Sequence, residues 1–144
     1  MIEIIEGADE AAIRAIVAQP DVWRWVSDDD VPEDWTLPNR HYLMLRKDGE
    51  AVGFFAFSEG TDALSLHVAM RPDFRGACVI DAGRKAIAWA RSKFHGKRIF
   101  AMVPLVNIRA IAAAKCCGFV HTRIPAPPWL RDGKRYPRIV MEVP

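Results

Sequence analysis

Two apolar runs on either side of a tight turn give residues 41–60, HYLMLRKDGEAVGFFAFSEG, the pattern of a β-hairpin. The Asp48-Gly49 pair is a strong signal for such a turn, because both residue types tolerate the positive φ that it requires. In the next segment, DALSLHVAM, apolar residues alternate with Ser65 and His67 until Pro72, which has no N–H for a strand ladder. The middle of the chain therefore predicts three consecutive strands.

Helical and extended segments alternate on both sides of these strands. Before them we expect a short strand at 2–5, a helix over 8–19, and a Trp- and Asp-rich short helix with a loop over 21–38. After them we expect a helix over 79–94, a strand over 97–104, a helix over 107–118, and strands over 119–124 and 138–143 separated by a Pro-rich segment. The order β-α-α-β-β-β-α-β-α-β-β predicts one mixed α/β domain over residues 1–144.

The composition limits the classes of protein to which the chain can belong. Of its 144 residues 51% are hydrophobic, which suffices for a packed core, yet no apolar run reaches the roughly 20 residues of a membrane helix. The N-terminus MIEIIEGADE lacks a signal-peptide stretch, and three cysteines make no disulfide framework. We therefore expect a soluble protein of the reducing cytoplasm.

Charge is unevenly distributed along the chain. Residues 1–70 contain 5 Lys and Arg against 14 Asp and Glu, whereas residues 71–144 contain 15 against 4. Either the fold mixes the two halves, or a basic side meets a polyanion and an acidic side meets a cation. The sequence leaves both interpretations open.

The stretch RPDFRGACVIDAGRKA, residues 71–86, combines an Arg-Pro turn, an Arg75-Gly76 pair and a helical run. The first four N–H groups of a helix have no partners within it, and the helix dipole there favours negative charge. Backbone N–H groups at 76–80 are therefore candidate donors to a phosphate. An ordinary strand-to-helix turn is the alternative interpretation.

Three local motifs and the order of elements resemble those of the GCN5-related N-acetyltransferase (GNAT) family. The motifs are KDGEAVGFFAF, VAMRPDFRGACVIDAGRKAIAWAR and VNIRAIAAAKCCGFV, and with the N-terminal segments the resemblance covers essentially the whole chain. It implies a mostly antiparallel central sheet, flanked by helices, in which the fourth and fifth strands splay apart. It also implies acetyl transfer from acetyl-CoA to a primary amine by direct attack.

The resemblance assigns candidate residues to the acyl donor. It places the diphosphate on Arg75, Gly76, Ala77, Cys78, Val79 and Ile80, the thioester carbonyl on the Met70 amide, and the pantetheine arm near Asn107, which is also a predicted helix N-cap. Cys78 and Ile80 stand where the family usually has small residues, so the expected phosphate loop is degenerate. The 3′-phosphate of the nucleotide has four further candidates, Arg84, Lys85, Lys97 and Arg98.

Proton transfer has several candidate residues. Where family members often have a tyrosine that protonates the thiolate, this chain has Ala114, and Cys116 and Tyr136 are the possible substitutes. A general base is needed for a protonated amine, whose pKa lies near 10. His67 on the fourth strand is the first candidate, and Glu33, Asp34 and Asp62 acting through water are the alternatives. The other histidines show no metal-ligand spacing, so no metal is expected.

The acceptor side of the site is expected in the Trp-rich segment. Trp23, Trp25 and Trp35, with Trp129 from the later loop, are candidate aromatic walls, and their acidic neighbours would suit a cationic acceptor. The residues leave a small-molecule amine and a peptide amine equally open. Asp28–Asp30 are expected either in a solvated loop or around a cation.

Two other functions remain as alternatives. A catalytically inactive domain that only binds or regulates would fit the substitutions at Cys78, Ile80 and Ala114. Nucleic-acid binding by the basic half ranks last, because the aromatic residues lie mostly in the acidic half. An exposed final strand, RIVMEV, predicts a possible homodimer through strand pairing.

Overall fold

The structure is a computed structural model that describes residues 2–144. Strand β1 (Ile2–Glu6) and two short helices, α1 (Glu10–Val17) and α2 (Pro20–Val26), lead into strands β2 (His41–Lys47), β3 (Glu50–Glu59) and β4 (Ala63–Met70). Helix α3 (Ala77–Lys93), strand β5 (Arg98–Pro104) and helix α4 (Ile108–Cys116) follow. The chain ends in strands β6 (Val120–His121), β7 (Trp129–Arg131), β8 (Lys134–Tyr136) and β9 (Arg138–Val143). Among these residues, no helix is both long and apolar enough to span a bilayer.

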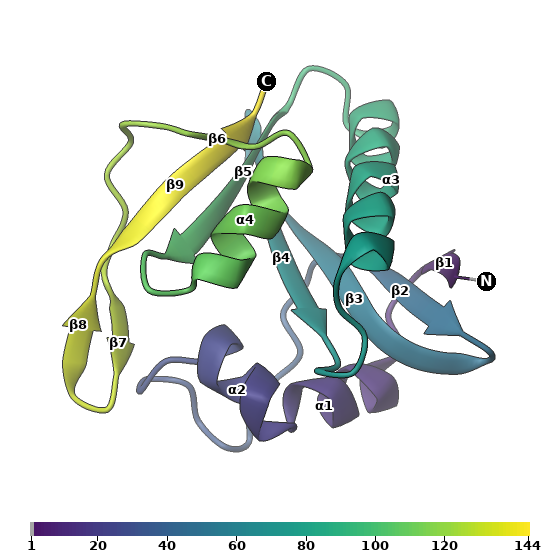
Figure 1. Cartoon of the computed structure of the whole chain (residues 1–144), viewed down its shortest axis with the longest axis horizontal. Helices are drawn as coiled ribbons and strands as arrows, with labels where there is room; N and C mark the ends of the chain where they lie inside the picture. Colours follow the sequence, from purple (N-terminus) through teal and green to yellow (C-terminus); the bar gives the residue numbers. More distant parts are fainter. Residues whose placement is uncertain (1) are drawn as a thin grey trace.

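Seven strands form one sheet in the order β1-β2-β3-β4-β5-β9-β6. Every neighbouring pair is antiparallel except β4 and β5, which are parallel and pair only from Ala63–Arg98 to Ser65–Phe100. Beyond this short ladder the two strands diverge (Figure 1). Residues 66–70 of β4 therefore have no strand beside them on that side, and this is the predicted splay.

Alternating side chains of the central strands pack into two separate hydrophobic cores, one on each face of the sheet. On one face Leu43, Phe55 and Phe57 pack with the apolar side of α3, including Ala86 and Ile87. On the other face, residues such as Met44 and Phe54 pack against α1 and α2. Both clusters follow from the two-residue period of β2 and β3, which places successive side chains on opposite faces.

The hairpin and the helix caps agree with the sequence patterns. Asp48 and Gly49 have φ of 52° and 81°, the two positive values of a type I′ turn. Asn107 caps α4 by accepting a hydrogen bond from the Ala110 N–H at 3.3 Å. Gly118, with φ of 96°, ends that helix in the left-handed conformation.

Three features of the C-terminal part differ from the prediction. The Pro-rich segment contains a second hairpin, β7–β8, whose turn residues Asp132 and Gly133 have φ of 53° and 70°. The strand expected over 119–124 is only Val120–His121. The final strand β9 lies between β5 and β6, so it is not the free edge that we expected to mediate a dimer.

Candidate functional site

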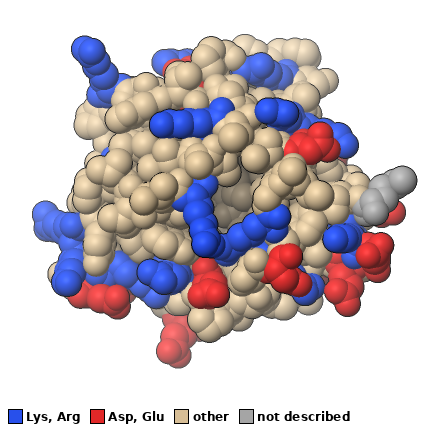
Figure 2. All heavy atoms as spheres, viewed as in Figure 1, with Lys and Arg blue, Asp and Glu red and all other residues tan. Residues whose placement is uncertain are grey.

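A cavity of about 660 Å³ lies where β4 and β5 part. Its walls come from α1, α2 and the following loop on one side, and from α3, β5 and α4 on the other. Figure 2 shows a hollow in the middle of this face, with basic side chains along its rim. The splay thus produces an opening at the centre of the sheet, large enough for a small organic ligand.

The start of α3 borders this cavity and presents unused backbone donors. Gly76 is the N-cap with φ of 101°, a conformation that favours glycine, and a Cβ added there would meet nothing within 4 Å. Within residues 2–144 the N–H groups of residues 75–78 donate no hydrogen bond. By contrast, the N–H groups of Val79 and Ile80 are directed at the Gly76 carbonyl, at 3.1 and 3.3 Å. The free donors are therefore fewer than the predicted set at 76–80.

The substituted positions do not close the site. Cys78 is exposed, and both Cys78 and Ile80 lie within α3 with ordinary negative φ. The side chains of Val79 and Ile80 line the cavity, whereas those of Arg75, Ala77 and Cys78 remain outside its lining. Ile80 thus narrows the cavity from one side and leaves the space beside Gly76 open.

Strand β4 presents backbone donors to the gap. The Arg71 N–H donates to the Val52 carbonyl of β3 at 2.8 Å. Since backbone groups alternate sides along a strand, the N–H groups of Val68 and Met70 face away from β3, into the gap. The Met70 side chain is buried and does not line the cavity, whereas Val68 is 43% exposed and does. The sequence interpretation named only Met70 and missed Val68.

His67 lies on the face of β4 that packs against α1 and α2, and it lines the cavity. Its Nε2 is 3.0 Å from the Ser58 Oγ. Burial, and to a smaller degree the nearby positive charge of Arg40, lowers the pKa of His67 to about 4. The imidazole is therefore neutral near pH 7, with one nitrogen able to accept a proton, but it is a weak base.

The other predicted bases lie outside the cavity. Glu33, Asp34 and Asp62 are exposed and are not among its lining residues. Among residues 2–144, Asp28 is the one carboxylate that lines it, at a position expected either in a solvated loop or around a cation. Asp29 instead accepts hydrogen bonds from the Asp132 and Gly133 N–H groups, which lower its pKa and tie the α2 loop to the β7–β8 turn.

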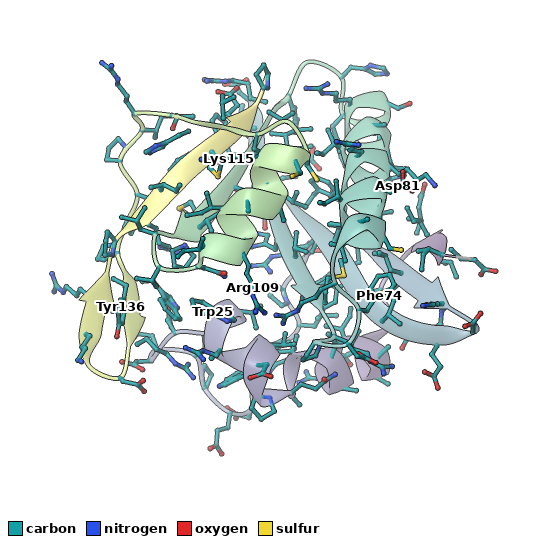
Figure 3. The ribbon with its side chains drawn as sticks, viewed as in Figure 1. Trp25, Phe74, Asp81, Arg109, Lys115 and Tyr136 are labelled. Atoms are coloured by element: carbon teal, nitrogen blue, oxygen red, sulfur yellow. The ribbon has the colours of Figure 1, made fainter. Side chains whose placement is uncertain are left out.

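All four predicted tryptophans line the cavity. Trp25 stacks on Trp129 with ring centroids 5.5 Å apart, and the Trp129 Nε1 donates to the Ser27 carbonyl at 2.9 Å. Figure 3 shows Trp25 below α4, with Tyr136 on β8 to one side and Arg109 between α4 and α2. The aromatic wall therefore joins α2 to the β7–β8 hairpin, two segments about 100 residues apart in sequence.

No predicted acid reaches the gap. Ala114 lines the cavity, whereas Cys116 is exposed and Tyr136, which packs on Trp129 at 5.4 Å, does not line it. Cys117 lines the cavity instead, but its thiol is directed at the Ile80 carbonyl, and burial raises its pKa. Asn107 lines the cavity close to its capping bond and retains a side-chain amide N–H₂ for a ligand.

The candidates for a 3′-phosphate are engaged with protein groups. Arg84 donates twice to the Cys116 carbonyl, and Lys85 pairs with Asp81 at 3.2 Å. Lys97 and Arg98 follow the C-terminal end of α3, opposite the helix start, and pair with Glu59 and Glu142. Lys97 and Arg98 therefore lie at the other end of α3 from the free amides, and their role at the 3′-phosphate stays a prediction.

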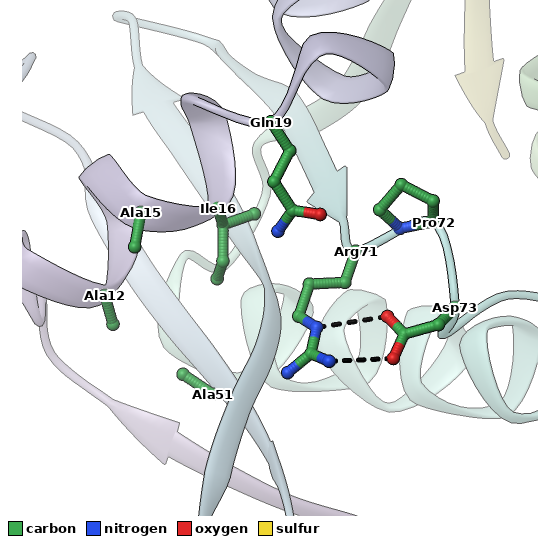
Figure 4. Close-up of a pocket in the computed structure, with 8 residues that line it drawn as sticks. All are labelled: Ala12, Ala15, Ile16, Gln19, Ala51, Arg71, Pro72 and Asp73. Atoms are coloured by element: carbon green, nitrogen blue, oxygen red, sulfur yellow. Dashed lines mark hydrogen bonds and ion pairs between the residues drawn. The ribbon is translucent and has the colours of Figure 1, made fainter.

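A second depression, of about 510 Å³, lies beside α1 and the end of β4 (Figure 4). Its only basic residue, Arg71, donates from Nε and Nη2 to the two carboxylate oxygens of Asp73, and its Nη1 pairs with Glu50 at 3.3 Å. The cation is thus already neutralised. Within residues 2–144 no three His, Cys, Asp or Glu side chains gather as a metal-binding group.

Known proteins share this fold and its family signature. The acetyltransferase (GNAT) family model matches residues 10–119, and no curated protein matches the chain. The structure is similar to spermidine N-acetyltransferase from Vibrio cholerae in complex with CoA and spermine, with a TM-score of 0.80 and 10% identity over 99% of this chain and 94% of that one. The expected fold class, a mostly antiparallel sheet with a splayed strand pair flanked by helices, is confirmed by this likeness.

Two further similar structures cover less of each chain. A ribosomal-protein-alanine N-acetyltransferase from Brucella melitensis has a TM-score of 0.63 and 17% identity over 72% of this chain and 67% of that one. A chimera of the Vibrio cholerae spermidine N-acetyltransferase has a TM-score of 0.65 and 15% identity, over 72% of this chain and 64% of the chimera. At such identities the likeness shows the fold alone.

Proposed function

Because this chain belongs to the acetyltransferase (GNAT) family, as the match over residues 10–119 shows, we propose that it transfers an acetyl group from acetyl-CoA to a primary amine of a small molecule or peptide. One observation carries the proposal. The first turn of α3, through Val79 and Ile80, lines the same cavity as the unpaired segment of β4. The unused donors of residues 75–78 directly precede Val79 in the chain, so that a long ligand can reach both the donors and the gap.

Backbone groups are proposed to hold the donor. The N–H groups of Gly76, Ala77 and Cys78, together with the α3 dipole, suit a diphosphate, because neither depends on the side chain present. The open space beside Gly76 allows close approach of the phosphates. Arg75, exposed and free of ion pairs within residues 2–144, adds positive charge at the mouth. Val79, Ile80 and Asn107 line the route into the gap.

Acetyl-CoA supplies an activated thioester carbonyl when bound. The N–H groups of Val68 and Met70 face the gap and are proposed to stabilise negative charge on that oxygen, for which preorganised donors contribute about 3 kcal/mol. His67 is the one predicted base that lines the cavity, so we assign it the proton that the amine nitrogen releases after it has attacked the carbonyl. An imidazole with a pKa of about 4 is too weak to deprotonate a free ammonium, whose pKa lies near 10. The carbon–sulfur bond then breaks without a protein acid, because Ala114 offers no hydroxyl and Cys116 and Tyr136 lie outside.

Titration calorimetry with acetyl-CoA, followed by detection of released thiol in the presence of different amines, tests this proposal. We expect a dissociation constant between about 1 μM and 1 mM, the usual range for an enzyme substrate. Absence of binding at millimolar acetyl-CoA would contradict it. Binding without thiol release for any amine would instead favour the inactive binding module, which the missing acid at Ala114 makes the second candidate.

A further inference from the structure

Arg40 is a positive charge inside the acceptor side of the cavity. It directly precedes β2, it is half-buried, and it lines the cavity with His67 and Trp35. Within residues 2–144 its guanidinium makes no hydrogen bond and no ion pair. Burial lowers its pKa, which means that the surroundings disfavour its charge.

This lack of a partner is unusual in the molecule. Six arginines are half-buried among residues 2–144, and five of them bind protein oxygens. Their acceptors are Glu10 and the Trp35 carbonyl for Arg14, Asp9 for Arg46, Asp73 and Glu50 for Arg71, the Ser27 hydroxyl for Arg131, and the Pro127 carbonyl for Arg138. Burying part of a cation without a partner costs free energy of folding. We therefore expect a bound ligand to be the partner of Arg40.

The register of the strands separates Arg40 from the phosphate end of the site. His41 pairs with Phe57, which pairs with Leu66, so Arg40 lies level with the start of the unpaired segment of β4. Phe57 contacts Trp89 of α3, with ring centroids 5.8 Å apart, and Trp89 lies twelve residues from Ala77 at the start of the helix, which is about 18 Å at the rise of a helix. The anion that meets Arg40 is therefore not the diphosphate and belongs to the other ligand.

We propose that the acceptor carries a carboxylate beside its reacting amine, as an amino acid does, and that Arg40 binds this carboxylate. The inference rests on the proposed acetyl transfer and names the acceptor class. A guanidinium fork matches a carboxylate with two parallel hydrogen bonds, and its single charge balances that of a carboxylate but not that of a phosphate. Asp28, the only acidic residue of the lining among residues 2–144, accepts the Asp30 N–H through Oδ1 at 2.9 Å and has Oδ2 for the ammonium. A polyamine carries only positive charges, which Arg40 would repel.

The test uses acetyl-CoA with the twenty L-amino acids and the matching amino acid amides, which differ only in the carboxylate. We expect kcat/KM to be at least about tenfold higher for an accepted amino acid than for its amide. Arg40→Gln should lower kcat/KM for the amino acid about 100-fold, the effect expected when one partner of a buried charge pair is lost. The same substitution should lower kcat/KM for the amide less than about threefold. Arg40→Lys restores part of the loss, because it keeps the charge without the fork.

Arg135→Gln is the matched control, since Arg135 is exposed on β8 and does not line the cavity. This substitution should change kcat/KM neither for the amino acid nor for its amide. Equal use of acids and amides, or preference for spermidine with an unaltered rate in Arg40→Gln, would overturn the proposal while leaving acetyl transfer intact. If acetyl-CoA does not bind at all, the carboxylate site can still be tested by titrating the chain with the amino acids and following its NMR resonances. A shift of the Arg40 Nε resonance supports the carboxylate site, and no shift at saturating concentrations rejects it.

Discussion

The two ends of the cavity use different kinds of groups. At the start of α3 the available donors are backbone N–H groups, and the substituted side chains at Cys78 and Ile80 leave them accessible. On the acceptor side the chemistry lies in side chains from several separate segments, among them Arg40, His67 and Trp129. The α3 end should therefore keep its affinity for the donor when side chains such as Cys78 are replaced. On the acceptor side, single substitutions should alter the specificity for the acceptor.

The largest effect is expected from the acceptor side, at His67. The pKa of His67 is about 4 in the folded protein, below the value of about 6.5 in the unfolded chain. As pH falls the unfolded state therefore binds the proton first, so stability is complete above about pH 6.5 and is lost as pH falls towards 4. The loss amounts to about 3 kcal/mol.

Urea unfolding at a series of pH values, for the wild type and His67→Gln, measures this loss. The difference in the pH dependence of the unfolding free energy between the two proteins should equal the contribution of His67. Parallel curves would mean that the imidazole is solvated in the folded state, which would contradict the burial of His67 in the cavity lining.

At the α3 end, Ala77→Pro removes one backbone donor without removing a helical hydrogen bond, because proline is tolerated at the first position of a helix. We expect the dissociation constant of CoA to rise about 30-fold, as for loss of a hydrogen bond to a charged group, with little change in melting temperature. Ala77→Ser keeps the N–H and is the control. Equal affinity in the two variants would show that this donor does not meet the ligand.

A smaller effect is expected at the aromatic wall. Trp25→Ala removes the stack on Trp129 on the acceptor side only. The KM of the acceptor should rise about fivefold, in line with the roughly 1 kcal/mol of an aromatic pair, while the affinity for CoA stays the same. Steady-state kinetics with each substrate varied in turn separates the two effects. A change in CoA affinity would contradict the division of the cavity into two ends.

The smallest effect is expected at Cys78. Because its side chain is exposed and outside the cavity lining, Cys78→Ala should change the CoA dissociation constant by less than about twofold, the range of ordinary surface substitutions. Calorimetry on the two proteins provides the comparison. A large loss or gain of affinity would show that the side chain contacts the ligand, against the backbone explanation.

Much of the fold could be predicted because local signals and tertiary structure agree. The Asp48-Gly49 turn, the Asn107 cap and the two-residue period of the central strands each state a conformation that the structure adopts. The β7–β8 hairpin carries the same kind of signal, an Asp-Gly pair at Asp132, but the prolines around it argue against strands, so the local pattern predicts a loop there.

The acceptor side could not be predicted in the same way. Its members are brought together by strand pairing and by the contact of the α2 loop with β7–β8, and neither leaves a local pattern. Arg40 has no motif around it, and its significance comes only from having no partner once the chain is folded. The acidic bias of residues 1–70 does not by itself locate the site, because carboxylates such as Asp9, Glu50 and Glu59 pair with basic side chains outside the cavity.

The proposed acetyl transfer depends above all on the binding of the diphosphate by free N–H groups at the start of α3. Titration of the ¹⁵N-labelled chain with CoA, followed through the backbone amide resonances, tests this binding directly. We expect saturable shifts that are largest at Gly76, Ala77 and Cys78. Unchanged resonances at these three residues with millimolar CoA present, or shifts confined to another part of the chain, would contradict it.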